Sequence, residues 1–369
     1  MSNLLFIHRG TACGSPEGHQ ALGLIMSAKQ IRSRLGLTLQ CQRAITVPEL
    51  DQSLALDQTS SVALVMPSWR SSVAELASLL DREKQRRPER TLALMDYYAP
   101  TCSPHFGLLP HVDVYIKRQV LRDRDVYQHD LAGGFLFTDY LVKQLGYDLD
   151  GWEFGSKPDP AYMDRLVVGW NLGVTPRYRH ILAWSRWLPW RWINRPIEVN
   201  CRLGIVRRAK TEWYERYREF AGDEVQRLAP SRSKTPVGRV GQKRYLWEML
   251  RSKIVFSPFG WGELCFRDYE AVCCGALLIK PSMEHLTTHP DIFVAGQTYV
   301  PVRWDLSDLG EKIEHYLSRP KEAAEIISNA QHVLREYYSK HQVVDGLKEA
   351  LEAAQQRSTS ANPAQLSTE

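Results

Sequence analysis

The stretch from Lys253 to Pro281, KIVFSPFGWGELCFRDYEAVCCGALLIKP, constrains the fold more than any other part of the chain. Lys253 to Pro258 is apolar and predicts a short buried strand. After the loop Phe259-Gly260-Trp261-Gly262, a helix is expected from about Glu263 to Gly275, because glycine is a good C-terminal cap. Ala276 to Lys280 predicts a second buried strand. A strand, a glycine loop, a helix and a strand in this order indicate a parallel α/β unit.

The start of this predicted helix favours the binding of an anion. The loop glycines allow positive φ and close approach of the backbone, and a helix N-terminus offers free N–H groups and positive dipole charge. At about 100° per residue, Glu263, Arg267 and Glu270 fall on one face of the helix. The opposite face, expected to pack on the sheet, consists of Cys265, Phe266, Tyr269, Val272 and Cys273. The alternative interpretation is an ordinary amphipathic helix on the surface of an α/β unit.

The residues SPFGWGE, RDYEAVCCGALLIKP, HL, a Pro-Asp pair and TYVPVRWD resemble bacterial GT-B glycosyltransferases that build surface polysaccharides. The resemblance covers mainly Lys253 to Leu309. It implies an α/β protein of the GT-B type, with two Rossmann-like domains facing a central cleft and a nucleotide-sugar donor held by the second domain. The residues to which it gives donor-binding roles are Gly260, Trp261, Gly262, Glu263, Arg267 and Glu270, the last of these on the ribose hydroxyls.

The spacing of two glutamates departs from the pattern of the large retaining GT-B families. Those families carry two glutamates eight positions apart, whereas Glu263 and Glu270 are seven apart in this chain. The role of Glu263 as a catalytic residue is therefore open, and so is the choice between a retaining and an inverting mechanism.

The composition is that of a soluble globular protein of about two domains. The chain has 369 residues, of which 44% are hydrophobic and 24% charged. Its net charge of +5 is too small to indicate a nucleic-acid partner. Seven cysteines without metal-ligand spacing and an N-terminus without a signal-like apolar run predict reduced thiols and a cytoplasmic location.

The N-terminal part alternates between strand and helix patterns, which predicts a doubly wound domain over residues 1–180 that binds the acceptor. The expected strands are Leu4–His8, Leu37–Cys41, Val62–Met66, Thr91–Met95 and Val112–Lys117, and the expected helices are His19–Leu35 and Ser71–Gln85. The loop after the first strand lacks a G-x-G-x-x-G pattern, so a dinucleotide-binding fingerprint is not supported.

Polar residues at the carboxyl ends of these strands are candidates for the acceptor side of the site, because ligands bind at that edge of such sheets. Asp96 follows the Thr91–Met95 strand and is the first candidate for the base that an inverting transfer requires. His8, at the end of the first strand, is the second. Glu17 and His19 are candidate acceptor-side residues. Each of the four could instead be a capping or loop residue.

The second domain is expected over residues 196–340. Its first strand, Ile197–Leu203, is followed by basic residues, and the resemblance implies that Arg202, Arg207 and Lys210 neutralise the donor diphosphate. We expect no metal and no cofactor, because the helix dipole and these cations would stabilise the departing phosphate. Residues 341–355 predict a helix that packs back on the first domain, and residues 356–369 predict a disordered tail.

A junction over residues 181–195 interrupts the alternation with tryptophans and arginines. Such a mixture suits a membrane interface, and the residues expected to contact the membrane are Trp184, Trp187, Trp190 and Trp192. The alternative is an interdomain hinge in which the indoles fill a core.

Together these observations predict a glycosyltransferase that moves a sugar from a nucleotide-sugar to a glycan or lipid-linked glycan, with possible peripheral contact with the inner face of the cell membrane. Two alternatives stay open. A GT-B sugar-nucleotide epimerase would bind the donor but no acceptor, and a non-catalytic GT-B-like glycan-binding or scaffold module would bind no nucleotide.

Overall fold

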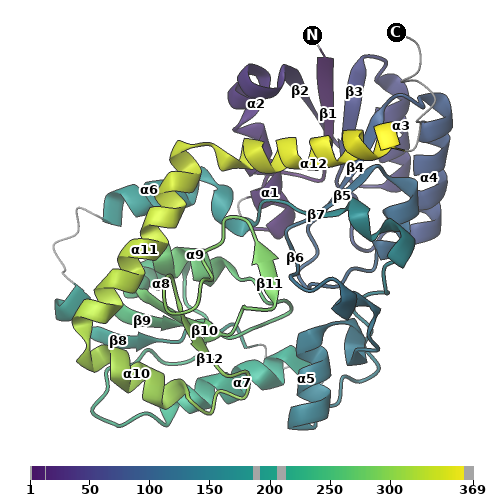
Figure 1. Cartoon of the computed structure of the whole chain (residues 1–369). Helices are drawn as coiled ribbons and strands as arrows, with labels where there is room; N and C mark the ends of the chain where they lie inside the picture. The colour runs from purple at the N-terminus through teal and green to yellow at the C-terminus, as the bar shows by residue number, and fades with distance from the viewer. Residues whose placement is uncertain (1, 13, 186–191, 206–212, 361–369) are drawn as a thin grey trace.

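The computed structural model describes residues 2–12, 14–185, 192–205 and 213–360. It contains two parallel sheets, each at the centre of an α/β domain (Figure 1). The two-domain α/β architecture predicted from the sequence is confirmed.

The first sheet has six parallel strands in the order β2-β1-β3-β4-β5-β7. They are β1 (Ser2–His8), β2 (Leu37–Arg43), β3 (Ser60–Val65), β4 (Thr91–Asp96), β5 (Val114–Lys117) and β7 (Leu166–Val168). The helices of this part are α1 (Pro16–Ile25), α2 (Ala28–Leu35), α3 (Val47–Leu56) and α4 (Val73–Arg86). All five expected strands are present. The prediction of one continuous helix over His19–Leu35 is wrong, because the segment forms two helices, α1 and α2. Helix α1 ends at Ile25, and Ser27 Oγ donates to the Gly23 carbonyl at this interruption.

The second sheet has four parallel strands in the order β12-β10-β9-β8. They are β8 (Ile197–Asn200), β9 (Ser252–Phe256), β10 (Leu277–Pro281) and β12 (Val300–Val302). The helices of this domain are α7 (Trp213–Gln226), α8 (Gln242–Leu250), α9 (Phe266–Cys273), α10 (Leu309–Ser318) and α11 (Pro320–Ser339). The strand–loop–helix–strand unit predicted from the sequence is confirmed as β9, α9 and β10.

Residues 119–155, which were expected in the first domain, also make contacts with the second. Strand β6 (Gln119–Leu121) pairs antiparallel with β11 (Leu286–Thr288). Phe137, in α5 (Leu136–Leu145), lies in an aromatic cluster with ring centroids 4.8–5.9 Å away; its partners are Trp213, Tyr217, Phe259 and Trp304. The two domains are thus joined by a shared sheet and a shared aromatic core.

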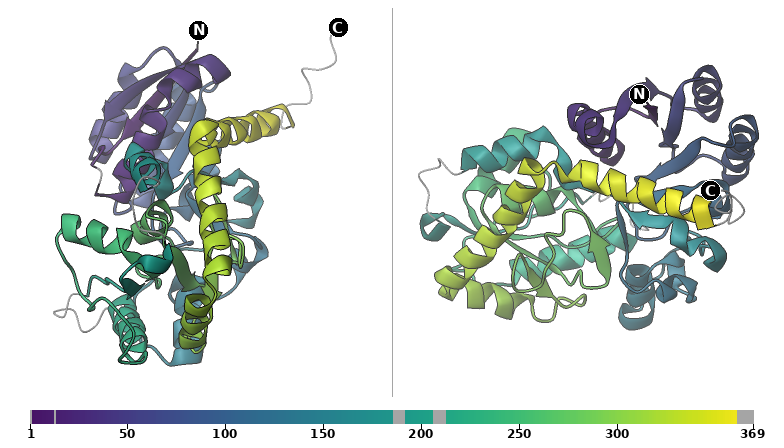
Figure 2. Two further views of the ribbon diagram at one scale, coloured as in Figure 1. Left: turned by 90° about the vertical axis from the view of Figure 1, so that its left-hand side faces the viewer. Right: turned by 45° about the horizontal axis from the view of Figure 1, so that its top comes forward.

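The C-terminal helix α12 (Gln342–Ser360) leaves the end of α11 and lies along the first domain (Figures 1 and 2). Its buried Val344, Leu347 and Ala350 belong to the same hydrophobic core as Leu4 and Phe6 of β1. The helix continues to Ser360, so the expectation of a disordered tail from residue 356 is wrong for residues 356–360.

The remaining elements are short, apart from α6 (Pro176–Ser185) in the junction. Segments of 3₁₀ helix lie at Phe106–His111, Asp125–Gln128, Ala132–Gly134, Pro160–Arg165, Leu172–Val174 and Trp192–Asn194.

Candidate active site between the two domains

A cavity of about 420 Å³ lies where the carboxyl ends of β8 and β9 face the first domain. We call it the basic cavity, because its described lining contains four arginines and one glutamate. The lining residues are Gly14, His19, Arg177, Tyr178, Arg202, Leu203, Gly204, Gly238, Arg239, Val240, Gln242, Tyr245, Cys265, Phe266, Arg267 and Glu270. This excess of positive charge suits an anionic ligand.

Arg267 and Glu270 both line the basic cavity, as their shared helix face predicts. Glu270 accepts hydrogen bonds from Tyr245 Oη at 2.8 Å and from Arg177 Nη2 at 3.2 Å. Burial raises the pKa of Tyr245 well above its ordinary value, so the hydroxyl stays protonated and donates. Arg267 Nη2 donates to the Arg202 carbonyl at 2.7 Å, and its Nε has no partner among the described residues. The cavity therefore contains an oriented carboxylate and a cation with a nitrogen still to be satisfied.

Arg202 is less available to a ligand than the sequence predicts. Its Nε and Nη2 donate to the two carboxylate oxygens of Glu248 at 2.7 and 2.9 Å, and both side chains are buried. The hydrogen bond from Arg202 is the main cause that holds the pKa of Glu248 below its ordinary value. Arg202 is thus committed to an ion pair in the cavity wall. Arg207 and Lys210, the other two basic candidates, lie outside the described residues.

The loop glycines are required for close approach and not for positive φ, which neither of them has. A β-carbon at Gly260 would lie 2.2 Å from Arg218 Nη2, and one at Gly262 would lie 2.2 Å from the Ala99 carbonyl oxygen. Gly262 is therefore the point at which the loop of the second domain touches the first domain.

Glu263 does not face the basic cavity, so its expected place beside Arg267 and Glu270 is wrong. Helix α9 begins at Phe266, and Glu263 lies in the loop before it. Its side chain is fully buried between the domains, where it accepts hydrogen bonds from the Thr101 hydroxyl and, at 2.9 Å, from Gln119 Nε2. In this structure Glu263 holds the two domains together.

The start of α9 already carries an internal carboxylate that sequence reasoning missed. Asp268 accepts from the Cys265 backbone N–H at 2.9 Å, and its carboxylate lies 3.2 Å from Lys280 Nζ. Both side chains are fully buried. The sequence signal of such a cap is an acidic residue three positions after the N-cap residue, as Asp268 is after Cys265. Asp268 fixes the first turn of α9, and Lys280 balances its charge.

A second cavity, of about 400 Å³, opens where loops of the first domain meet Trp261. We call it the aromatic cavity; its lining residues are Pro16, Glu17, Trp69, Arg70, Tyr97, Tyr98, Ala99, Trp152, Tyr214 and Trp261. The start of α1, which follows β1, and the loop after β3 contribute to it, and the strand order of the sheet reverses between β1 and β3. Ligands of open α/β sheets bind at such a switch point. Glu17 is the one carboxylate among the described residues that line this cavity.

Asp96 is wrong as the predicted base. It is buried at the end of β4, where it accepts hydrogen bonds from Tyr98 N at 2.7 Å and Tyr115 Oη at 2.8 Å. Lys117 Nζ lies 3.3 Å from the same carboxylate. Burial acts to raise the pKa of Asp96, but the Lys117 charge and the hydrogen bonds outweigh it and hold the pKa below its ordinary value. Asp96 is thus bonded to these partners and lines neither the basic nor the aromatic cavity, so it is not placed beside an acceptor hydroxyl in this structure.

The two histidine candidates lie in different surroundings. His8 is buried at the end of β1 and is not among the residues that line the two cavities. Burial is the main cause that lowers its pKa, so the imidazole is neutral at pH 7. His19 was expected on the acceptor side but lies in the wall of the basic cavity, where its ring packs on Phe266 with centroids 4.6 Å apart. Phe266 thus faces this cavity and not the sheet.

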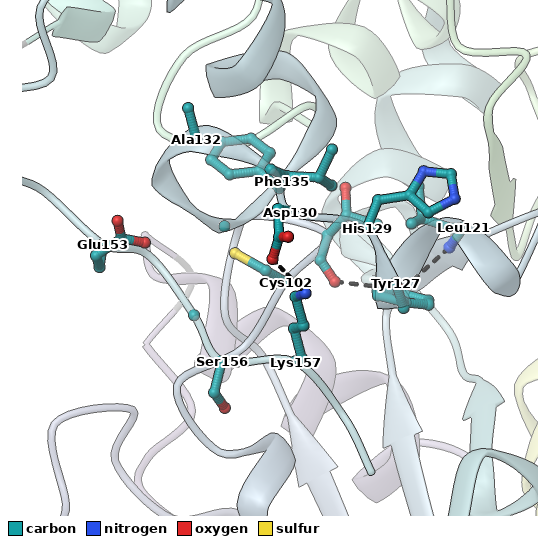
Figure 3. A pocket seen from close by; sticks show the side chains of 14 residues that line it. Cys102, Leu121, Tyr127, His129, Asp130, Ala132, Phe135, Glu153, Ser156 and Lys157 are labelled. Carbon is teal, nitrogen blue, oxygen red and sulfur yellow. Dashed lines mark hydrogen bonds and ion pairs between the residues drawn. The ribbon is translucent and has the colours of Figure 1, made fainter. Parts of the chain in front are cut away.

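A third cavity, of about 380 Å³, has Thr101 and Cys102 among its lining residues (Figure 3). Asp130 and Lys157 form an ion pair there, and Tyr127 Oη donates to the Thr101 carbonyl at 3.4 Å. None of the residues predicted from the sequence lines this cavity. One of its lining residues, Thr101, donates its hydroxyl to Glu263 in the contact between the domains.

The tryptophans of the junction differ in exposure. Trp184, at the end of α6, is 61% exposed. Trp192 is half-buried, and its Nε1 donates to the Lys253 carbonyl at 2.7 Å. This bond ties the polar atom of Trp192 to the second domain. Trp187 and Trp190 lie outside the described residues.

Among residues 2–12, 14–185, 192–205 and 213–360, no group of three or more His, Cys, Asp and Glu side chains could hold a metal ion. In the same part of the chain, no helix has the length and apolar character needed to cross a bilayer.

Residues 201–348 match the model of a family described as glycosyl transferase-like. No curated protein sequence matches the chain. Sucrose-phosphate synthase from Thermosynechococcus elongatus is similar in fold at 11% identity, with a TM-score of 0.52 over 96% of this chain and 100% of that chain. An alpha-glucosyltransferase in complex with UDP and a 13-mer DNA containing a HMU base is similar at 12% identity, with a TM-score of 0.50 over 96% and 99% of the two chains. Identities this low show a shared fold.

The shared fold extends over almost the whole chain and consists of two Rossmann-like domains, which is the GT-B architecture. The family match covers the second domain and includes Arg202, Arg267 and Glu270 of the basic cavity. The chain is therefore a glycosyltransferase with GT-B architecture.

Proposed function

We propose that this enzyme moves a sugar from a nucleotide-sugar in the basic cavity to a glycan or lipid-linked glycan in the aromatic cavity, in the synthesis of bacterial surface polysaccharide. The observation that carries the proposal is that two segments line both cavities. In α1, Glu17 belongs to the aromatic cavity and His19 to the basic one. In the loop before α9, Trp261 belongs to the first and Cys265 to the second. A donor and an acceptor bound there would meet between these segments.

The basic cavity suits a nucleoside diphosphate. A guanidinium binds phosphate oxygens with two parallel hydrogen bonds, and the Nε of Arg267 has no partner among the described residues. Glu270, held by Tyr245 and Arg177, presents a carboxylate that can accept hydrogen bonds from ribose hydroxyls.

The aromatic cavity suits a sugar unit of the acceptor. One face of a pyranose ring carries mainly C–H groups, which pack on aromatic rings, while the hydroxyl groups at its edge need polar partners. The cavity offers both, with the rings of Trp69, Tyr98, Trp152 and Trp261 beside Glu17 and Arg70.

A thermal-shift screen with UDP, GDP and CMP compounds, followed by a transfer assay with the matching nucleotide-sugars, tests the proposal. A ligand at 100 times its Kd raises the free energy of unfolding by about 2.7 kcal/mol. Transfer to a glycan supports the proposal. Isomerisation of the nucleotide-sugar without any acceptor would instead support an epimerase, and the absence of nucleotide binding would support a non-catalytic module.

Replacing Glu270 by alanine is expected to weaken nucleotide binding by about 10- to 100-fold, because it removes charge-assisted hydrogen bonds to ribose of about 1.5–3 kcal/mol. Calorimetric titration of the folded variant measures the effect. The control is Glu219→Ala, on the exposed side of α7, which should bind like the wild type. Equal affinity of Glu270→Ala and the wild type would remove Glu270 from the donor site.

We also propose peripheral contact with anionic membranes through the exposed Trp184. Wild-type protein should co-sediment with vesicles that contain anionic lipid, and less so as the salt concentration rises. Trp184→Ser should reduce this binding without a change in thermal stability, since the indole is 61% exposed. Trp192→Ser should instead lower thermal stability, because Trp192 donates to the Lys253 carbonyl. Unchanged vesicle binding by Trp184→Ser would contradict the proposal.

A further inference from the structure

Arg118 directly follows β5 and is 1% exposed between the two domains. Its Nη2 donates to the Ala99 carbonyl oxygen at 3.1 Å. Its Nε and Nη1 have no hydrogen-bond partner among the described residues. Burying a guanidinium costs free energy when one hydrogen bond replaces its contacts with water. An oxygen ligand at the two unpartnered nitrogens would offset this cost.

The Arg118 guanidinium lies next to the contact between Ala99 of the first domain and Gly262 of the second. The Ala99 oxygen to which it donates is the same atom that a β-carbon at Gly262 would meet at 2.2 Å. Burial acts to lower the pKa of Arg118, and the groups that act to raise it are Tyr269, Glu263, Asp96 and Cys265. Three of these four belong to the loop before α9 or to α9 itself. Arg118 thus faces the start of α9 from the first domain.

The two carboxylates near Arg118 at the contact between the domains, Glu263 and Asp96, already have other hydrogen-bond partners. Glu263 accepts from the Thr101 hydroxyl and from Gln119. Asp96 accepts from Tyr115 and lies beside Lys117. Neither carboxylate forms an ion pair with Arg118 in the described part of the chain. The positive charge of Arg118 therefore has no bonded counter-charge within the described protein.

Cys265 and Arg267, at the same helix start, line the basic cavity. We propose that Arg118 is a phosphate ligand supplied by the first domain: with donor bound, its Nε and Nη1 bind oxygens of the diphosphate that Arg267 contacts from the second domain. The inference rests on the proposed function. Arg118 does not line the basic cavity in this structure, so the proposal requires Ala99 and Gly262 to separate when the donor binds.

This placement gives Arg118 a role in the reaction as well as in binding. When the bond between the sugar carbon and the phosphate oxygen breaks, the electron pair stays on that oxygen. The new bond forms to the acceptor oxygen, whose proton passes to a base in the aromatic cavity, where Glu17 is the carboxylate among the described lining residues. A fixed cation next to the leaving oxygen stabilises the charge that develops there. Because the two arginines come from opposite domains, the diphosphate also links the domains.

The test compares Arg118→Gln and Arg118→Lys with the wild type by calorimetric titration with UDP and GDP and with uridine and guanosine. For whichever diphosphate the wild type binds, Arg118→Gln should weaken binding about tenfold or more, and Arg118→Lys should restore part of the loss. Affinity for the nucleoside should not change, because the nucleoside lacks the phosphates.

The matched control is Arg195→Gln. Arg195 is also buried with an unpartnered Nε, but its other nitrogens donate to the Ser252 and Cys274 carbonyls away from the cavity. This variant should lower thermal stability and leave diphosphate affinity unchanged. If Arg118→Gln behaves like Arg195→Gln, Arg118 is a structural residue and the inference is overturned. If the wild type binds CMP but neither UDP nor GDP, the inference fails and the proposed function stands. If it binds none of the three nucleotides, the proposed function fails first, so the two failures are distinguishable.

Discussion

Replacing Glu17 by glutamine is expected to lower turnover by about 10²–10⁴-fold, the usual contribution of a general base, and to leave donor affinity unchanged. An inverting transfer needs a base beside the acceptor hydroxyl. Asp96 does not line the aromatic cavity, and its carboxylate is bonded to Tyr115 and Lys117. Glu17 is the carboxylate among the described residues of the aromatic cavity. Glutamine keeps the shape and removes the basic oxygen, so kcat should fall with little change in donor binding.

The control for Glu17→Gln is Glu75→Gln. Both residues are the acidic residue in the first turn of a helix, α1 and α4, so both substitutions remove the same favourable interaction with the helix dipole. Glu75 does not line the aromatic cavity, and its variant should keep normal turnover. Retention of the anomeric configuration in the product, measured by NMR, would contradict a base at Glu17, and so would near-normal turnover of the glutamine variant.

Replacing Asp96 by alanine is expected to lower the free energy of unfolding by about 3–5 kcal/mol, because it leaves the buried Lys117 ammonium without its counter-charge. Chemical denaturation measures this. The exposed Asp223→Ala serves as the control and should change the free energy of unfolding by less than about 0.5 kcal/mol. A fully stable Asp96→Ala protein would contradict the role assigned to this pair.

The contribution of Asp96 to stability should also depend on pH. Its pKa in the folded protein lies below that in the unfolded chain, so the folded state favours the ionised form. The stabilisation is complete above the unfolded pKa of about 3.9 and is lost as the pH falls through the folded pKa. The difference in stability between wild type and Asp96→Ala should therefore shrink as the pH falls below about 4.

Much of the fold could be predicted because its signals are local. The strand, glycine loop, helix and strand between Lys253 and Pro281 follow from apolar runs and cap residues. The shared cavity face of Arg267 and Glu270 follows from the 3.6-residue period of the helix. The close approach of the backbone at Gly260 and Gly262 was also expected. The sequence could not predict that Arg218 and Ala99 are the residues that these glycines approach.

The rest depends on contacts between residues far apart in the chain. Glu263 was placed on a helix that begins only at Phe266, and its partner Thr101 lies on a loop of the other domain. Asp96 follows a strand as expected, but β5 places Lys117 beside it, which only the register of two strands determines. Arg118 carries no sequence motif at all. Its importance comes from burial and missing partners, which require the folded chain.

The most direct test of the central claim is a crystal structure of the protein with the nucleoside diphosphate that it binds. The account predicts the ribose within hydrogen-bond distance of the Glu270 carboxylate and the diphosphate beside Arg267 at the start of α9. Density for the nucleotide in another cavity, such as the one around Asp130 and Lys157 (Figure 3), would contradict the assignment of the basic cavity as the donor site.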